Sequence, residues 1–309
     1  MHRLVTSALL LGSLCLLGAS VSGCGAKKSP PTIADMLARA RKAKTPEAQA
    51  RELTRVAVQQ AGADKTGAAK TLGEALAAIP ADGQPLAAVP VLVEIATTYA
   101  AIGERASAQK AVATAVAMTK RLADDPLGQA CLLAQIGTVQ GSRENGLGDR
   151  ATAEATLAEA SQIASSQVPE RFRGKALAAV ATGYADAGLA AAAQDMIGSL
   201  EELARTLDDL RPKAEAFAAA AAVRAAAGEK EAAKALLDEA AKAAKAIDDF
   251  PANRSYALLA VAKASLAVGD APTAKTLLAE AEKAASKVGD PQQQKDALRA
   301  IRGLQAKLE

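Results

Sequence analysis

Aromatic side chains and histidine are almost absent from this sequence of 309 residues. It contains three Tyr, three Phe and no Trp, which together make up 2% of the chain. Proteins that bind single-stranded nucleic acids stack bases on aromatic rings, and proteins that bind duplexes carry strong positive charge. With so few rings and a formal net charge of only +3, we expect no nucleic-acid partner.

The scarcity of histidine and cysteine also excludes most enzymes and metal sites. The one histidine, His2, lies in an N-terminal segment that we expect to be removed. Without it the chain has no Ser-His-Asp or Cys-His arrangement and no ordinary zinc site. Of the three cysteines, Cys131 lies in the apolar stretch ACLLAQI, where we expect a core position. We therefore predict that the protein is not an enzyme and holds no cofactor or metal.

The N-terminus has the pattern of an export signal. Arg3 is followed by an apolar run from Leu4 to Leu17, which is shorter than the roughly 20 residues of a membrane span. Small residues follow, and then the sequence Val-Ser-Gly-Cys, which ends at Cys24. This resembles the bacterial lipoprotein signal, in which an aliphatic residue and two small residues precede a cysteine that receives a diacylglycerol. The alternative is an ordinary secretory signal with Cys24 left as a free thiol.

The resemblance to lipoproteins implies a cellular location and three segments. Residues 1–23 would be the removed signal peptide, residues 24–32 a lipidated tether, and residues 33–309 the folded region. Acyl chains on Cys24 would anchor the mature chain to a membrane of the bacterial cell envelope, because two or more chains give stable anchoring. Gly25 rather than Asp follows the cysteine, which favours the outer membrane if the cell is Gram-negative.

The residues that are abundant predict helices. Half of the residues are apolar, and Ala dominates together with Lys, Glu and Leu. Ala has the best intrinsic helix propensity. No alternating run of β-branched residues longer than a few positions occurs, so no sheet is expected. We therefore predict an all-α protein.

Two similar pentapeptides, YAAIG and YADAG, indicate an internal repeat. The glycines that end them belong to a series with spacings of 41, 45, 40, 40 and 41 residues: Gly62, Gly103, Gly148, Gly188, Gly228 and Gly269. Prolines keep a similar period, and several follow acidic residues, which suits helix starts: Pro85, Pro126, Pro169, Pro212, Pro251 and Pro291. Because glycine suits the left-handed position after a helix end, each unit is predicted as helix, Gly turn, helix. The one wider spacing indicates an inserted loop, Gly141–Gly148.

Large apolar residues and alanines recur at fixed offsets from these glycines. Before Gly188, for example, lie Leu177, Val180 and Tyr184. This resembles the tetratricopeptide repeat over about residues 44–308, although that family has a unit of about 34 residues and a Trp that is missing here. HEAT-like packing is the alternative. The resemblance implies a solenoid of about six antiparallel helix pairs with a C-terminal capping helix, in which Tyr99 and Tyr184 pack in the core.

A solenoid of this type presents one helix of each pair on its inner surface. Register with the glycines places nine candidate groove residues there: Val93, Thr97, Lys175, Thr182, Asp186, Glu215, Tyr256, Leu259 and Lys263. The groove would be mostly small or apolar, and it lacks the Asn/Lys/Arg cluster with which some tetratricopeptide proteins grip a C-terminal carboxylate. We expect it to bind an apolar helix or an extended peptide of an envelope protein. The alternatives are a passive spacer lipoprotein and a protein that binds cell-wall fragments or small molecules.

Overall fold

The computed structural model describes residues 31–248 and 250–308. The signal peptide 1–23, the lipidation site Cys24 and almost all of the tether 24–32 lie outside these residues, so they stay predictions. Within the described ranges the chain is all helical and contains no strand, which confirms the predicted fold class.

Fourteen α-helices and one short 3-10 helix follow one another along the described chain. In chain order they are α1 (Ile33–Ala40), α2 (Pro46–Gln60), α3 (Lys65–Ala78), α4 (Pro85–Ile102), α5 (Arg105–Thr119), η1 (Lys120–Leu122), α6 (Pro126–Gly141), α7 (Arg150–Ser166), α8 (Glu170–Asp186), α9 (Ala190–Thr206), α10 (Leu210–Ala226), α11 (Lys230–Lys245), α12 (Pro251–Val268), α13 (Ala271–Ala285) and α14 (Pro291–Gln305).

Consecutive helices pack in pairs, and each pair packs against the next. The helix pairs are α2 with α3, α4 with α5, α6 with α7, α8 with α9, α10 with α11, and α12 with α13. The first helices of successive pairs also contact one another, from α2 through α4, α6, α8 and α10 to α12. At the C-terminal end, α14 packs on α12 and α13. These packed neighbouring pairs are consistent with a helical-repeat solenoid.

The turn between the two helices of a pair has the same structure four times. It is formed by glycines with positive φ angles between 74° and 94°: Gly103, Gly188, Gly228 and Gly269. In the first turn, Glu104 N donates to the carbonyl oxygen of Tyr99 at 2.9 Å, and the other three turns have the equivalent bond. This is the Schellman motif, whose left-handed residue is usually glycine because a Cβ is strained there.

The predicted turn is wrong at Gly62 and displaced at Gly148. Gly62 is not among the residues with positive φ; α2 ends in the right-handed residue Ala61, and the chain then turns into Asp64, the N-cap of α3. Gly148 has a φ of 67°. It does not follow the end of α6 directly, because the inserted loop separates it from Gly141. Both exceptions belong to the units whose sequences are irregular.

Acidic residues and prolines mark helix starts as the sequence predicts. The carboxylates of Asp125, Asp209 and Asp290 accept backbone N–H bonds from the first turns of α6, α10 and α14. Pro85 and Pro251 occupy the start of α4 and α12. There the missing N–H of proline removes no intrahelical hydrogen bond, so the residue favours the helix start without weakening the helix.

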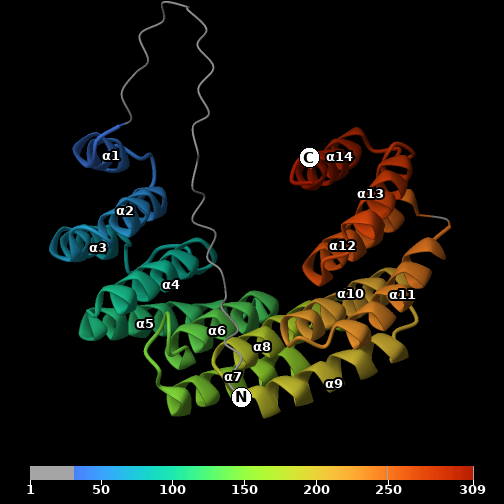
Figure 1. Ribbon diagram of the computed structural model, residues 1–309, viewed down its shortest axis with the longest axis horizontal. Helices are drawn as coiled ribbons and strands as arrows, with labels where there is room; N and C mark the ends of the chain where they lie inside the picture. The colour runs from blue at the N-terminus through green and yellow to red at the C-terminus, as the bar shows by residue number, and fades with distance from the viewer. Residues whose placement is uncertain (1–30, 249, 309) are drawn as a thin grey trace, which may run out of the picture.

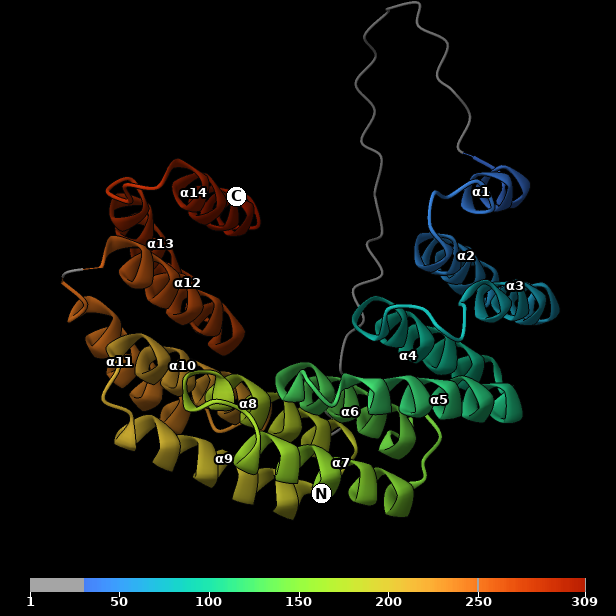
Figure 2. The ribbon, with the colours of Figure 1, turned by 180° about the vertical axis from the view of Figure 1, so that it is seen from behind.

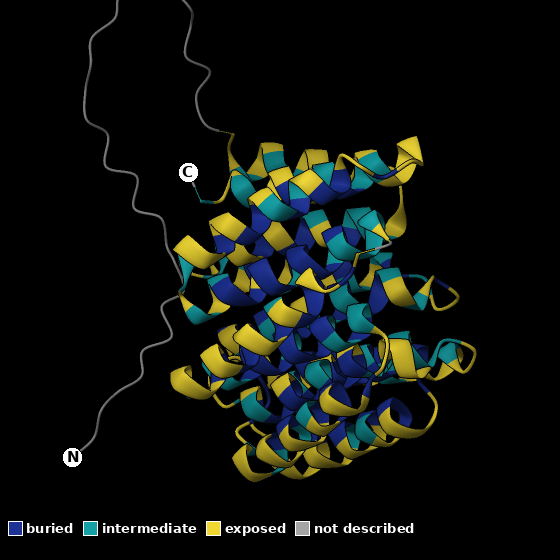
Figure 3. Cartoon of the chain, turned by 90° about the vertical axis from the view of Figure 1, so that its right-hand side faces the viewer, coloured by how far each residue is buried: buried dark blue, intermediate teal, exposed yellow. Residues whose placement is uncertain are grey.

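The helix pairs form an open arc, with α1 to α3 at one end and α12 to α14 at the other (Figures 1 and 2). Helices α4, α6, α8 and α10 lie on the inner side, and α5, α7, α9 and α11 on the outer side. Buried residues run between these two layers, and exposed residues cover the outer surfaces (Figure 3). Tyr99 and Tyr184 are 4% and 6% exposed, which confirms their predicted core positions.

Helix α4 is the one described helix with the length and apolar composition of a membrane span. Half of that span is buried inside the fold, where α4 contacts α2, α3, α5 and α6. The core helix of a folded domain has the same composition, since it buries apolar surface on several sides.

Candidate binding groove

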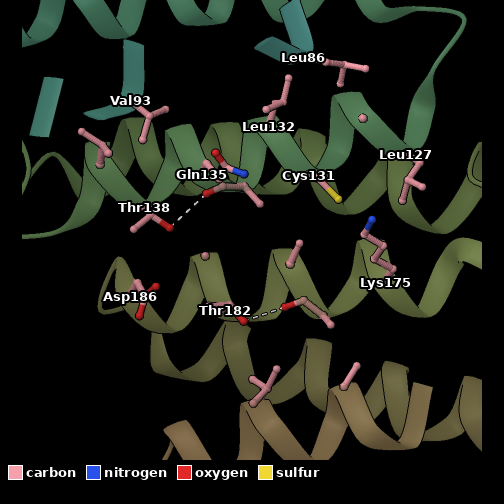
Figure 4. A pocket seen from close by; sticks show the side chains of 18 of the residues that line it. Leu86, Val93, Leu127, Cys131, Leu132, Gln135, Thr138, Lys175, Thr182 and Asp186 are labelled. Atoms are coloured by element: carbon pink, nitrogen blue, oxygen red, sulfur yellow. Dashed lines mark hydrogen bonds between the residues drawn. The ribbon is translucent and has the colours of Figure 1, made fainter. Parts of the chain in front are cut away.

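The inner side of the arc carries an open groove of about 970 Å³. Its walls come from α4, α6, α8 and α10, the first helices of four successive pairs (Figure 4). Most of the lining side chains are small or apolar. A groove that is open along its length and mostly apolar suits an extended or helical segment of another chain.

Small side chains at helical spacing line the two central walls. On α8 they are Ala178, Ala179 and Thr182, which lie between Lys175 and Asp186. These positions share one face of the helix, because residues three, four, seven and eleven apart follow the helical period. The wall from α6 includes Gly128, Cys131, Gln135 and Thr138, which are three or four residues apart, and also the larger Leu127 and Leu132. Small side chains on both walls allow a third helix to approach closely.

Helix α8 approaches α6 and α7 closely at the groove floor, because Gly183 lies at this contact. A Cβ at Gly183 would lie 3.0 Å from the carbonyl oxygen of Ala134 and 2.7 Å from Cδ2 of Leu157. A Cβ at Gly137 would lie 2.5 Å from Cγ of Leu157. No side chain fits at either glycine without a shift of its neighbours, so Gly183 keeps α8 close to α6, and Gly137 keeps α6 close to α7.

Two ionic side chains lie at opposite ends of the α8 wall (Figure 4). Lys175 and Asp186 are eleven residues apart, which is about 16 Å along a helix. Asp186 is exposed to the open groove, and partial desolvation by the surrounding walls raises the pKa of its carboxyl above the ordinary range. No ion pair with the described residues compensates this effect. The carboxylate therefore favours a cationic group in whatever occupies that end of the groove.

The opposite end of the groove carries mixed charge. Lys175 and Asp125 both lie near the Cys131 thiol, and burial raises the pKa of that thiol. Asp125 uses its carboxylate to cap α6, where Gly128 N donates to it at 2.9 Å. A raised pKa keeps Cys131 in its thiol form, which makes it an apolar lining residue rather than a nucleophile. No cluster of three or more potential metal ligands occurs among the described residues.

Five of the nine candidate groove residues line this groove: Val93, Thr97, Lys175, Thr182 and Asp186. Glu215 lies in a neighbouring recess, where its carboxylate pairs with Arg211 at 2.8 Å. The guanidinium of Arg211 also lies 5.1 Å from the ring centroid of Tyr256, within the range of a cation–π interaction. Glu215 and Tyr256 thus both contact Arg211, and neither lines the groove.

Leu259 and Lys263 do not line the groove, and Leu259 requires a correction. Leu259 is 4% exposed and belongs to the hydrophobic core. Helix α12 packs against α10, α11, α13 and α14, and Leu259 lies within this packed core rather than on an open face. Lys263 is exposed on α12, outside the groove walls.

The candidate residues chosen from the sequence did not include the wall formed by α6. Gln135, Thr138 and Cys131 line the groove, and Cys131 is half-buried there instead of lying in the core as expected. The unit that contains Gly148 contributed no candidate residues, because the inserted loop separates that glycine from the end of α6. Counting from the proline that starts each helix places Thr138 twelve residues after Pro126, the same offset as Thr97 from Pro85.

No protein-family model matches the chain, and no curated protein matches it. Among solved structures, the crystal structure of Ton1535 from Thermococcus onnurineus NA1 is similar to it, with 13% sequence identity and a TM-score of 0.39. The match covers 86% of this chain and 94% of that chain. A likeness at this level shows neither a shared family nor a shared function.

Proposed function

We propose that the chain is a lipoprotein of the bacterial envelope whose arc of helix pairs serves as a scaffold for another envelope protein. Each pair from α2/α3 to α12/α13 is interpreted as one tetratricopeptide-like unit, and α14 as the capping helix. Acyl chains on Cys24 would hold the arc at the membrane surface. The observation that carries the proposal is the open, mostly apolar groove lined by four successive helices.

The groove favours a helical or extended partner segment with an apolar stripe. Ala178, Ala179 and Thr182 leave room for larger apolar side chains from the partner. A cationic residue of the partner would compensate the desolvated carboxylate of Asp186, and an acidic residue about 16 Å away would face Lys175. Charges arranged in this way fix the orientation of the bound segment more than they add affinity.

Site-specific photocrosslinking in cells tests the scaffold function. A photoreactive amino acid placed at Gln135 would lie in the groove, and one at Ser199 on α9 would lie on the outer side as the matched control. Both side chains are exposed, so neither substitution disturbs the core. We expect a discrete adduct with an envelope protein from position 135 and none from position 199.

A blocking substitution gives an independent measurement. Thr182→Arg should fill the groove and remove both the adduct and complementation of any deletion phenotype, whereas Ser199→Arg should preserve both. If neither position gives a specific adduct and Thr182→Arg complements fully, the scaffold function is wrong. The passive spacer would then be the better interpretation.

The lipid anchor has its own test, which does not depend on the groove. Cys24→Ala should abolish labelling by a fatty-acid analogue and move the protein from the membrane fraction to the soluble fraction. Retention of the Cys24→Ala protein in the membrane fraction would contradict the anchoring role of this residue.

A further inference from the structure

The five helices from α4 to α12 that begin a pair share one position near their C-terminal ends. At this position the backbone carbonyl oxygen accepts a hydrogen bond from the backbone N–H of the residue that caps the start of the next helix. The N···O distances are 2.7–2.9 Å. The residues in this joint position are Tyr99, Gln140, Tyr184, Arg224 and Ser265. Gln140 belongs to this set although the inserted loop lies between it and its donor, Asp149 N.

Two of the side chains at the joint position, Tyr99 and Arg224, donate hydrogen bonds to the preceding pair. The hydroxyl of Tyr99 donates to the carbonyl oxygen of Ala69 on α3 at 3.3 Å. Arg224 donates to the side chain of Gln194 on α9 at 3.0 Å. Both partners lie 30 residues earlier in the chain. The rings of Tyr99 and Tyr184 are almost fully buried, so they fill the space between one pair and the next.

The same space is open at Gln140. A crevice of about 470 Å³ lies there, lined by Gln140, by α5 and by the start of α7. Its lining includes Gln109 and Ala113 on α5, which lie five and nine residues after the N-cap of that helix. The residues at the same two positions of α3 are Ala69 and Gly73. Ala69 and Gly73 are the residues that Tyr99 approaches. The crevice therefore lies where a tyrosine ring packs at the first joint.

Gln140 is a polar side chain whose hydrogen-bonding capacity is unused. It is 5% exposed, and its Oε1 atom accepts no hydrogen bond from the described residues. A buried amide without a partner costs stability, so such a group is normally paired. Oε1 is shielded from solvent, so an O–H or N–H donor in the crevice supplies the missing partner when the Gln140 amide turns toward it.

The other walls of the crevice are mostly apolar, with Gln109 and Thr152 as polar residues and with two charged side chains, Asp149 and Lys120. The apolar lining consists of Val112, Ala113, Val116, Ala117 and Leu147, the last from the inserted loop. Asp149 is committed to the cap of α7, because its two oxygens accept bonds from the amide and the hydroxyl of Thr152 at 3.1 and 2.7 Å. Lys120 at the rim forms no ion pair with the described residues, so it is available to an anion.

We propose that this crevice binds a small aromatic molecule that carries both a hydrogen-bond donor and an anionic group. The ring takes the place that a tyrosine ring has at the neighbouring joints, the donor bonds Oε1 of Gln140, and the anionic group pairs with Lys120. A crevice of this volume falls within the range of small-molecule sites, which is about 300–1,000 Å³.

This site is separate from the groove of the proposed function. The two share no lining residue, and the crevice lies between α5 and α7 rather than between α6, α8 and α10. Binding in the crevice requires neither the lipid anchor nor a protein partner. The two proposals can therefore fail independently.

Binding of p-hydroxyphenylacetate to the purified mature protein tests the proposal by calorimetry or ligand-observed NMR. We expect saturable binding of p-hydroxyphenylacetate. The affinity should be at least tenfold lower for p-hydroxyphenylacetamide, which lacks the charge, and for phenylacetate, which lacks the hydrogen-bond donor. Gln140→Tyr places a ring in the crevice, as at two other joints, and should abolish binding while the thermal midpoint stays equal or rises. Lys120→Gln should lower the affinity for p-hydroxyphenylacetate but leave the affinity for p-hydroxyphenylacetamide unchanged.

Ala113→Phe provides a second blocking variant in case Gln140→Tyr does not fold, because Ala113 is exposed on α5 and its substitution leaves the core intact. Tyr184→Phe is the matched control at another joint and should bind like the wild type. Absence of saturable binding to the wild type would overturn the proposal. So would equal affinity in the wild type and in whichever of Gln140→Tyr and Ala113→Phe is folded.

Discussion

At the residue scale, the turn glycines are required for their backbone angle rather than for their size. Gly228 has a φ of 86°, and a Cβ built there would meet no atom within 4 Å. The same open surroundings hold at Gly62, which lacks a positive φ. The two glycines therefore separate the effect of backbone strain from the effect of crowding.

We predict that Gly228→Ala lowers the free energy of unfolding by about 1–2 kcal/mol, the cost of a left-handed residue with a Cβ. Gly62→Ala should be neutral or slightly stabilising, because Ala restricts the unfolded chain without strain in the fold. Urea denaturation of both variants measures the difference. An equal loss in the two variants would show that the left-handed angle is not the cause.

Asp186 gives a second prediction at this scale, which concerns pH. Its folded-state pKa is raised by desolvation, so ionisation in the folded protein is less favourable than in the unfolded chain. Stability is thus lost as pH rises from the unfolded pKa of about 3.9 through the higher folded value. Asp186→Asn should therefore be more stable than wild type at pH 7 and equally stable near pH 3. A constant difference at both pH values would exclude ionisation as the origin.

At the scale of the element, Gly183 determines how closely α8 packs against α6 and α7. Gly183→Ala would bring a methyl group to 2.7 Å from Leu157 and 3.0 Å from a backbone oxygen. We predict a loss of about 1–3 kcal/mol from overpacking, even though Ala is the better helix former. Gly198→Ala on α9 is the control, because its added methyl meets nothing within 4 Å and should stabilise by up to about 1 kcal/mol. Thermal unfolding measures both, and a stable Gly183→Ala protein would show that the contact can relax.

The sequence allowed the elements to be predicted wherever their limits depend on backbone chemistry. The left-handed glycine and the proline at a helix start are local requirements, so their periods identified the helix pairs. The faces of the helices were harder to predict, because they depend on packing. Leu259 is buried by helices that pack on α12, and Gln140 was not recognised as the equivalent of Tyr99 because an inserted loop changed its distance from the glycine.

The same limits apply to the groove. The small residues on α8 follow the helical period, and that period was sufficient to place Thr182 and Asp186. The joint crevice could not be predicted from the sequence. The absence of a ring at Gln140 becomes clear only when this residue is compared with the tyrosines at the same position in other pairs. An insertion next to a substituted joint residue is the signal to search for in similar chains.

At the scale of the whole molecule, the arc is held together by neighbours alone. The main contacts join helices of the same pair or of adjacent pairs, and the terminal helices α1 and α14 have neighbours on one side only. Their buried surface is correspondingly small: α1 buries Ala40, and α14 buries Ala297 and Ile301. In an array of this kind, stability is a sum of local terms rather than one cooperative total.

We predict a gradient of amide hydrogen exchange along the arc. Helices α6, α8 and α10, which pack on both sides, should be the most protected, and α1 and α14 the least. Mass spectrometry of peptides after timed exchange measures this gradient. Equal protection from one end to the other would indicate a single cooperative unit and would contradict nearest-neighbour stability.

Ile301→Ala tests the local character of this stability directly. Ile301 is fully buried where α14 meets the array, and removing its methyl groups should cost about 2–4 kcal/mol at that contact. In a nearest-neighbour array, a loss of stability at one contact affects only the helices that form or adjoin that contact. Exchange should therefore accelerate in α14 and in its neighbours α12 and α13, while α4 and α5 stay as in the wild type. Acceleration in α4 would mean that the two ends of the arc are coupled, and the groove between them would then respond to changes at the C-terminal end.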